Sequence, residues 1–182
     1  MPYMLLGEEG KAHFERLRLQ KYEPVSRAVA ELGLYRLSGA ADSAMIINYV
    51  PTRFPGEHED FASYELGING HRVVVDSGAY SPEGESWDKY FRSARAHNIL
   101  LIDDRLPQPD TDHSPILMPE ELDLHEGQSG VRLPPANCDR AGVVSQRFFL
   151  CLGGRAWVVL DLVCGEGSHR LQIGRASCRE RV

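Results

Sequence analysis

The hydrophobic and polar positions alternate with a period of two over much of the chain after Gly33, which is typical of half-buried β-strands. The segment before Gly33 differs, because it is rich in Glu, Lys, Arg, Leu and Ala and its apolar positions recur at helical spacing. We therefore predict helix over residues 8–32, divided near Pro24. Strands are predicted over residues 34–37, 45–50, 62–68, 71–76, 98–102, 143–151 and 156–163.

Short turns join neighbouring strands in this pattern. Asn69-Gly70 lies between two β-type runs, which is the strongest local signal for a hairpin, and Gly153-Gly154 joins the last two strands in the same way. Residues 103–137 are rich in Pro, Asp and Gly, so we predict long loops there with one weak strand. The predicted fold class is mainly β, with an incomplete antiparallel β-sandwich over residues 33–172 that follows a short helical segment at residues 1–32.

The last ten residues do not continue the β pattern. IGRASCRERV, residues 173–182, contains three arginines and resembles the translation of a short-read sequencing adapter. We therefore expect residues 173–182 to be a non-native tail, and the chain to be a fragment of a longer protein.

Composition excludes several classes of function. The chain has 182 residues, of which 42% are hydrophobic and 25% are charged, and these values are ordinary for a globular domain. Its formal net charge of -6 argues against nucleic acid as a partner. No run reaches the roughly 18 apolar residues of a transmembrane helix, so no membrane partner is expected. Four cysteines without a C-x-x-C pair do not make a disulfide framework.

Three polar clusters lie beside predicted strands, at residues 55–60, 76–78 and 90–98. In a hairpin that turns at Asn69-Gly70, paired residues have numbers that sum to about 139, so Asp76 lies near Ser63 and His58 follows along the same edge. His97 opens a later strand and can complete the group. Two imidazoles and a carboxylate make a competent zinc set, with water as the fourth ligand.

Each of these residues also has an ordinary explanation. A single His58 in a loop is more often a surface residue than a ligand, and Asp76 before Ser77-Gly78 is a typical turn former. Arg92 could simply neutralise nearby acids. A cupin-like metal enzyme that uses His58 and Glu65 is a further alternative, but it needs additional histidines at fixed spacing.

The order and spacing of the clusters resemble the heparinase II/III-like family of polysaccharide lyases. The resemblance is carried by HEDFASYELGINGHRVVVDSGAY at residues 58–80 and WDKYFRSARAHNILLID at residues 87–103. It implies an N-terminal α/α toroid domain, of which residues 1–32 would be the remnant, followed by the β-sandwich. It also implies β-elimination of uronic-acid-containing polysaccharides such as heparin, heparan sulfate or alginate, with the proton-transfer residues in the toroid.

The resemblance implies a role for each candidate residue. His58, Asp76 and His97 match positions that hold a structural divalent metal, and zinc is the expected ion. His58 is also the candidate for a catalytic contact, although many relatives carry a second histidine where this chain has Gly56. Arg92 is expected to bind a carboxylate or sulfate of the substrate by bidentate pairing, or to pair with an interior acid such as Asp103.

The sequence therefore predicts a piece of a lyase that is inactive alone, with an acidic polysaccharide and the missing toroid domain as partners. The alternative is a non-catalytic carbohydrate-binding or structural β-sandwich, which the loss of the first histidine favours. The full-length protein is expected in the periplasm or outside the cell, with the cytoplasm as the second location. We expect poor solubility, because an incomplete sandwich exposes a strand edge.

Overall fold

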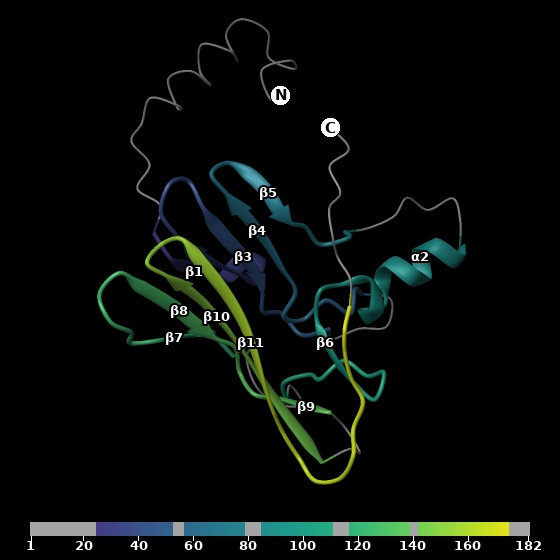
Figure 1. Ribbon diagram of the computed structural model, residues 1–182. Helices are drawn as coiled ribbons and strands as arrows, with labels where there is room; N and C mark the ends of the chain where they lie inside the picture. Colours follow the sequence, from purple (N-terminus) through teal and green to yellow (C-terminus); the bar gives the residue numbers. More distant parts are fainter. Residues whose placement is uncertain (1–24, 53–56, 79–84, 111–116, 139–141, 175–182) are drawn as a thin grey trace, which may run out of the picture.

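Two antiparallel sheets pack face to face in the computed structural model, and α2 stands away from them beyond β6 (Figure 1). The structure describes residues 25–52, 57–78, 85–110, 117–138 and 142–174. The first sheet has the strand order β1-β2-β3-β4-β5. Its strands are β1 (Arg27–Val29), β2 (Leu34–Ser38), β3 (Ala44–Asn48), β4 (Tyr64–Ile68) and β5 (His71–Val74).

The second sheet has the order β11-β10-β8-β7, and β9 also pairs with β10. These strands are β7 (Glu120–Glu121), β8 (Gln128–Arg132), β9 (Ala136–Cys138), β10 (Val143–Leu152) and β11 (Ala156–Cys164). A small third sheet joins β6 (Leu100–Ile102) to β12 (Leu171–Ile173). The helical elements are α2 (Glu85–Arg92) and two 3₁₀ turns, η2 (Ala30–Leu32) and η3 (Ala94–Ala96). The prediction of a mainly β antiparallel fold is confirmed.

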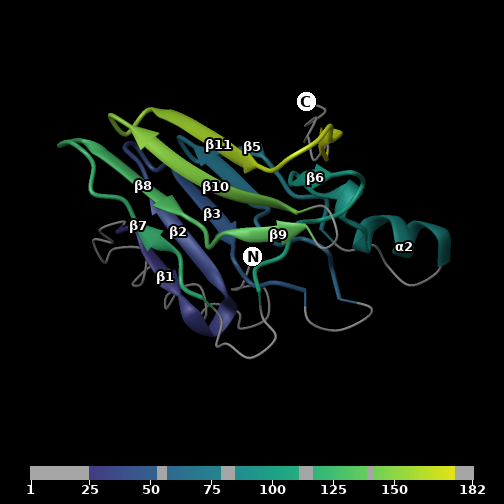
Figure 2. The same cartoon turned by 90° about the horizontal axis from the view of Figure 1, so that it is seen from below.

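The core lies between the two large sheets, because every second residue of the central strands points inward. Met45 and Ile47 of β3 are buried on one side, and Phe149 and Cys151 of β10 are buried on the other. Figure 2 shows the two layers from below. Within the described ranges, no helix has both the length and the apolar run needed to cross a membrane.

The two predicted hairpin turns are present. Asn69 and Gly70 both have positive φ, 51° and 76°, as a type I′ turn requires. Gly153 and Gly154 have φ of 57° and 67° between β10 and β11. Gly154 is also packed closely, since a Cβ at this position would lie 2.8 Å from the Cβ of Ala40, in the turn between β2 and β3. Local turn chemistry therefore sets both hairpins.

The helix predicted over residues 8–32 is wrong at its described end. Residues 27–29 form β1, which pairs antiparallel with β2, and residues 30–32 make only one 3₁₀ turn. Pairing with the edge of β2 in a local hairpin satisfies backbone groups over this stretch and overrides helix propensity. Residues 8–24 lie outside the described residues.

The region predicted as loops, residues 103–137, contains three strands. The most important is β8, which lies between β10 and β7 in the second sheet. Gly130 in its middle is a packing residue, because a Cβ there would lie 2.7 Å from a side-chain carbon of Leu150. A glycine that reads as a loop signal in the sequence thus serves close packing inside a strand.

The boundary of the predicted tail falls inside a paired strand. Ile173 pairs with Leu100 of β6, and the N–H of Gly174 donates to the carbonyl of Ile99 at 3.0 Å. Residues 175–182, which make up the rest of this tail, lie outside the described residues.

The outer face of β11 is apolar and open. Its residues Val158, Leu160 and Leu162 are exposed, and they alternate with inward-facing positions along the strand. Among the strands that the structure describes, β11 pairs only with β10. A nine-residue strand with a free backbone edge and an apolar face is a ready site for self-association.

Candidate functional site

The loop that carries His58 is fixed against the end of α2. The N–H of Glu59 donates to the carbonyl of Arg92 at 2.9 Å, and the Glu59 carboxylate accepts the N–H of Ala94 at 3.0 Å. The hydroxyl of Thr52 donates to the carbonyl of His58 at 2.8 Å. Two of the polar clusters predicted from the sequence, residues 55–60 and 90–98, therefore meet in the fold.

His97 is completely buried and paired with Asp76. Its Nδ1 lies 2.8 Å from Oδ1 and 3.0 Å from Oδ2 of that carboxylate. The His58 ring is close by, with 5.6 Å between the two ring centroids. Asp76 also accepts the N–H of Gly78 at 3.0 Å, so its turn-forming role is present as well. The structure thus brings together the three residues that the sequence selected as metal ligands.

A second acid, Asp60, belongs to the same electrostatic group. Burial raises its pKa, the positive charges of His97 and His58 oppose this, and the charge of Asp76 adds to it. For His97, burial favours the neutral ring, but the hydrogen bond to Asp76, the charges of Asp76 and Asp60, and the nearby carbonyl of Phe91 outweigh it and raise the pKa. The charges of His97 and Asp60 therefore influence each other.

The donor set of this cluster fits the chemistry of a zinc site. Imidazole and carboxylate are zinc ligands, and His97 Nε2 is buried without a hydrogen-bond partner in the described part of the chain. Nδ1 faces Asp76, which is the partner that commonly orients a metal-binding histidine. Among the described residues, however, no three such side chains are arranged around one point. The described geometry is that of a hydrogen-bonded His–Asp pair beside a second imidazole.

A shallow groove runs over the outer face of the first sheet next to this cluster. Its volume is about 410 Å³, and its lining includes Asp60, Asp76, Glu65, Ser63 and Tyr64. Three carboxylates on one groove repel an anionic ligand unless positive charge offsets them. His97 bonds to Asp76 from behind the groove and does not line it.

Arg92 lies on the last turn of α2 and pairs with Asp88 one turn earlier. Its Nε lies 3.0 Å from both oxygens of that carboxylate. Asp103 instead accepts from His169 Nδ1 at 2.7 Å, so the expected pairing of Arg92 with Asp103 is wrong. An (i, i+4) partner on the same helix is closer than an acid in another turn. The substrate contact of Arg92 remains a prediction.

Three residues that support the site were not selected from the sequence. The Asn98 amide accepts the N–H of Tyr64 at 3.0 Å and donates to its carbonyl at 2.7 Å, as a neighbouring strand would. Arg147 makes a two-pronged contact with Asp161 at 2.7 and 2.8 Å. It also donates to the carbonyls of Ala62 and Asn98, at 3.0 and 2.9 Å.

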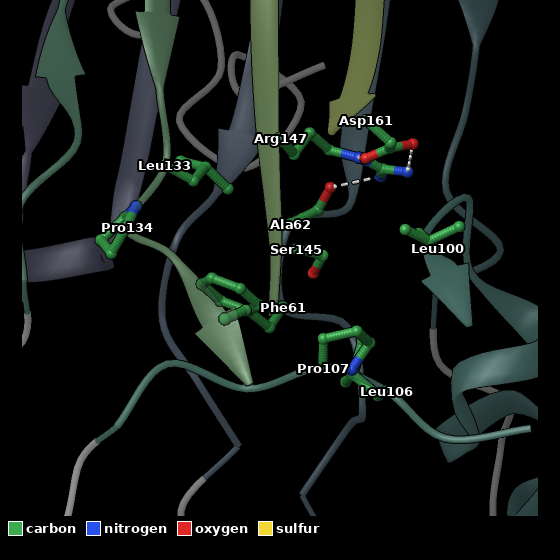
Figure 3. A pocket seen from close by; sticks show the side chains of 11 residues that line it. Phe61, Ala62, Leu100, Leu106, Pro107, Leu133, Pro134, Ser145, Arg147 and Asp161 are labelled. Atoms are coloured by element: carbon green, nitrogen blue, oxygen red, sulfur yellow. Dashed lines mark hydrogen bonds and ion pairs between the residues drawn. The ribbon is translucent and has the colours of Figure 1, made fainter. Parts of the chain in front are cut away.

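Figure 3 shows the Arg147–Asp161 pair beside a small cavity of about 20 Å³. Arg147 is only 5% exposed, so the pair lies in the core. Alternation along β10 places Arg147 on the inward face, and this position was the available sequence signal. Because the pair holds Asn98, which follows His97, the core of the second sheet supports the cluster directly.

Comparison with known proteins gives three findings. A family model described as heparinase II/III-like, C-terminal, matches residues 23–176. Curated proteins give no match. Among solved structures, the heparan sulfate lyase HepC from Pedobacter heparinus is 18% identical with a TM-score of 0.65, and the match covers 92% of this chain and 27% of that one.

A structure titled heparinase III, BT4657 gene product, is 17% identical with a TM-score of 0.64. The match covers 93% of this chain and 27% of the other. At these identities the likeness concerns the fold. The chain spans about a quarter of the length of the solved proteins it resembles.

Proposed function

Because this chain belongs to the heparinase II/III-like C-terminal family, we propose that it is the β-sandwich part of a polysaccharide lyase. The substrate class is a uronic-acid-containing polysaccharide, such as heparin, heparan sulfate or alginate, and the reaction is β-elimination. The observation that carries this proposal is the His58–Asp76–His97 cluster at the side of an open groove.

β-Elimination needs a base for the proton next to the uronate carboxylate, positive charge near that carboxylate, and an acid for the leaving oxygen. In this proposal the cluster supplies the positive charge. That charge would come from a divalent ion held by these residues, because His97 itself is fully buried and its Nδ1 faces Asp76. The base and the acid belong to the rest of the longer protein, so the chain alone binds and positions but does not cleave.

We also propose that a divalent metal, with zinc as the expected ion, is held by His58, Asp76 and His97. When bound, it supplies fixed positive charge and ties the loop of His58 to that of Asp76. The donor chemistry of these three side chains supports this proposal. Calorimetric titration with ZnCl₂ should show one binding event that His97→Asn and Asp76→Ala abolish, while His125→Asn on the exposed loop before β8 leaves it unchanged.

Zinc binding that survives both substitutions would contradict this metal site. For the lyase role, the test is the absorbance of unsaturated uronate after incubation of heparan sulfate and alginate with this chain. We expect no product from the chain alone, and product from the longer protein that contains it. In the longer protein, His97→Ala should lower the rate at least tenfold, and an unchanged rate would refute the role of the cluster.

The second candidate is a non-catalytic carbohydrate-binding or structural sandwich. The observation in its favour is Gly56, at the position where many relatives have a first histidine. It predicts a longer protein that binds acidic polysaccharide and forms no unsaturated product. We further propose a periplasmic or secreted location for the longer protein, which fractionation beside a periplasmic marker would test.

A further inference from the structure

The helix α2 presents a ridge of aromatic side chains. Trp87, Tyr90 and Phe91 are spaced i, i+3 and i+4, which places them on one face of the helix. Trp87 is 58% exposed and Tyr90 is 44% exposed. In Figures 1 and 2 the helix stands away from both sheets, and none of the three residues belongs to a core cluster of the described chain.

The rings hold one another in fixed orientations. The Trp87 and Tyr90 centroids lie 6.2 Å apart with an interplanar angle of 90°, and those of Tyr90 and Phe91 lie 5.4 Å apart at 79°. Edge-to-face contacts of this kind are favourable arrangements of aromatic pairs. The ridge is therefore an ordered surface with two rings open to solvent.

The ridge begins at the rim of the His58–Asp76–His97 cluster. Glu59, next to His58, bonds to the carbonyl of Arg92 at the end of α2 and to the N–H of Ala94 after it. The carbonyl of Phe91 faces the His97 ring and raises its pKa. The C-terminal end of α2 is therefore tied to the loop of His58, and the aromatic ridge lies on the helix that leads away from the cluster.

The exposed area fits a sugar ring better than a protein partner. Aromatic side chains of this size offer roughly 150–250 Å² each, so the open parts of Trp87 and Tyr90 amount to about 200 Å². A stable protein interface buries about 800 Å² on each partner. Pyranose rings have apolar C–H faces that stack on flat aromatic rings. The acidic class of the saccharide comes from the proposed function, because the charges of α2, with Asp88 beside Lys89 and Arg92, do not select it.

We propose that Trp87 and Tyr90 form a stacking platform for one sugar ring of an acidic polysaccharide, just outside the His58–Asp76–His97 cluster. This inference rests on the proposed function, because it takes the ligand class from it. The platform is a binding subsite, and it takes no part in proton transfer.

Tryptophan fluorescence gives a direct test, since the chain has two tryptophans, Trp87 and Trp157. In a Trp157→Phe background the emission reports Trp87 alone. Titration with a heparan sulfate hexasaccharide or an alginate hexasaccharide should quench this emission in a saturable way, whereas the neutral maltohexaose should not. Circular dichroism melts would verify that the background variant remains folded.

Calorimetry then measures the affinity of each variant for the better hexasaccharide. Trp87→Ala should weaken binding about tenfold, which corresponds to about 1.4 kcal/mol, while Trp87→Phe should stay within about threefold of the wild type. Met118→Ala is the matched control, because Met118 is 51% exposed beside residues of the second sheet, and its loss removes a contact with the Tyr49 hydroxyl but should leave the hexasaccharide affinity unchanged.

The outcomes separate the two proposals. If the wild type binds and Trp87→Ala binds equally well, the platform is refuted and the proposed function stands. If the wild type binds neither acidic hexasaccharide, the polysaccharide role of this domain fails and the platform fails with it. If the Trp87 emission does not respond to any of the three sugars but changes with protein concentration, α2 contacts another protein molecule and the platform is refuted.

Discussion

Removal of the carboxylate of Asp161 is the sharpest test of how the fold supports the site. Arg147 is 5% exposed and has Asp161 as its charged partner. Asp161→Ala leaves the guanidinium in the core with only the carbonyls of Ala62 and Asn98 as partners. Breaking a buried ion pair on one side costs about 3–5 kcal/mol, since the remaining charge is uncompensated.

This loss is large beside the total. A domain of this size has a free energy of unfolding of about 5–15 kcal/mol. With a urea m-value of about 2 kcal/mol/M, the unfolding midpoint should fall by about 2 M. Glu65→Ala is the matched control, because the Arg72–Glu65 pair lies on the surface, and an exposed pair contributes at most about 1 kcal/mol.

The double variant Arg147→Met with Asp161→Leu tests whether the two charges act as a pair. It removes both charges and leaves two buried carbonyls unpaired, each at a cost of about 1–3 kcal/mol. The double variant should therefore lose about 2–6 kcal/mol, below the sum of the losses of the single variants Arg147→Met and Asp161→Leu, each about 3–5 kcal/mol. Urea denaturation followed by circular dichroism measures all three variants. Additive losses, or a loss below about 1 kcal/mol for Asp161→Ala, would refute the argument.

Three further predictions concern other parts of the fold. Gly154 and Gly127 both have positive φ, but of these two only Gly154 has a neighbour that an added Cβ would contact. In urea denaturation, Gly154→Ala should therefore lower the free energy of unfolding by about 1–3 kcal/mol more than Gly127→Ala does. Equal losses would contradict this. The hydrogen bond between His169 and Asp103 raises the pKa of the imidazole and lowers that of the carboxyl. Its stabilisation is complete between about pH 3.9 and 6.5, and it is lost as pH rises through the raised pKa or falls through the lowered one. Hydrogen-exchange protection of β12 should therefore decline from pH 6 to pH 9, and His169→Gln should remove this dependence. Leu160→Lys, on the exposed face of β11, should raise the protein concentration at which light scattering detects aggregates. An unchanged concentration would show that this face does not cause the aggregation.

The elements that the sequence predicts well are those whose cause is local. The Asn69-Gly70 turn needs only two residues that accept positive φ, and the alternation of β10 and β11 is visible within each strand. β8 was missed because the reason for Gly130 is the Leu150 side chain that covers it. β1 was missed because its residues individually favour helix. The pairing with β2 that overrides this preference is not visible in their propensity.

The same distinction applies to the candidate site. His58, Asp76 and His97 could be selected as a group, since the hairpin turn and the family resemblance fix their order. Arg147 and Asn98 could not, because their hydrogen bonds join residues 34 to 85 positions apart. Long-range polar contacts leave no period in the sequence, so only the folded chain reveals them.

The bulge in the β4–β5 hairpin decides the face on which Asp76 lies. Gly67 pairs with Arg72, but Leu66 pairs with Val74, so Val73 has no partner and the return strand is advanced by one residue. With the same residues and no bulge, each later residue of the return strand would stand opposite the preceding position of β4, whose side chain points to the other face of the sheet. The Asn69-Gly70 turn alone therefore does not direct the carboxylate towards His97. One extra residue in the return strand does so.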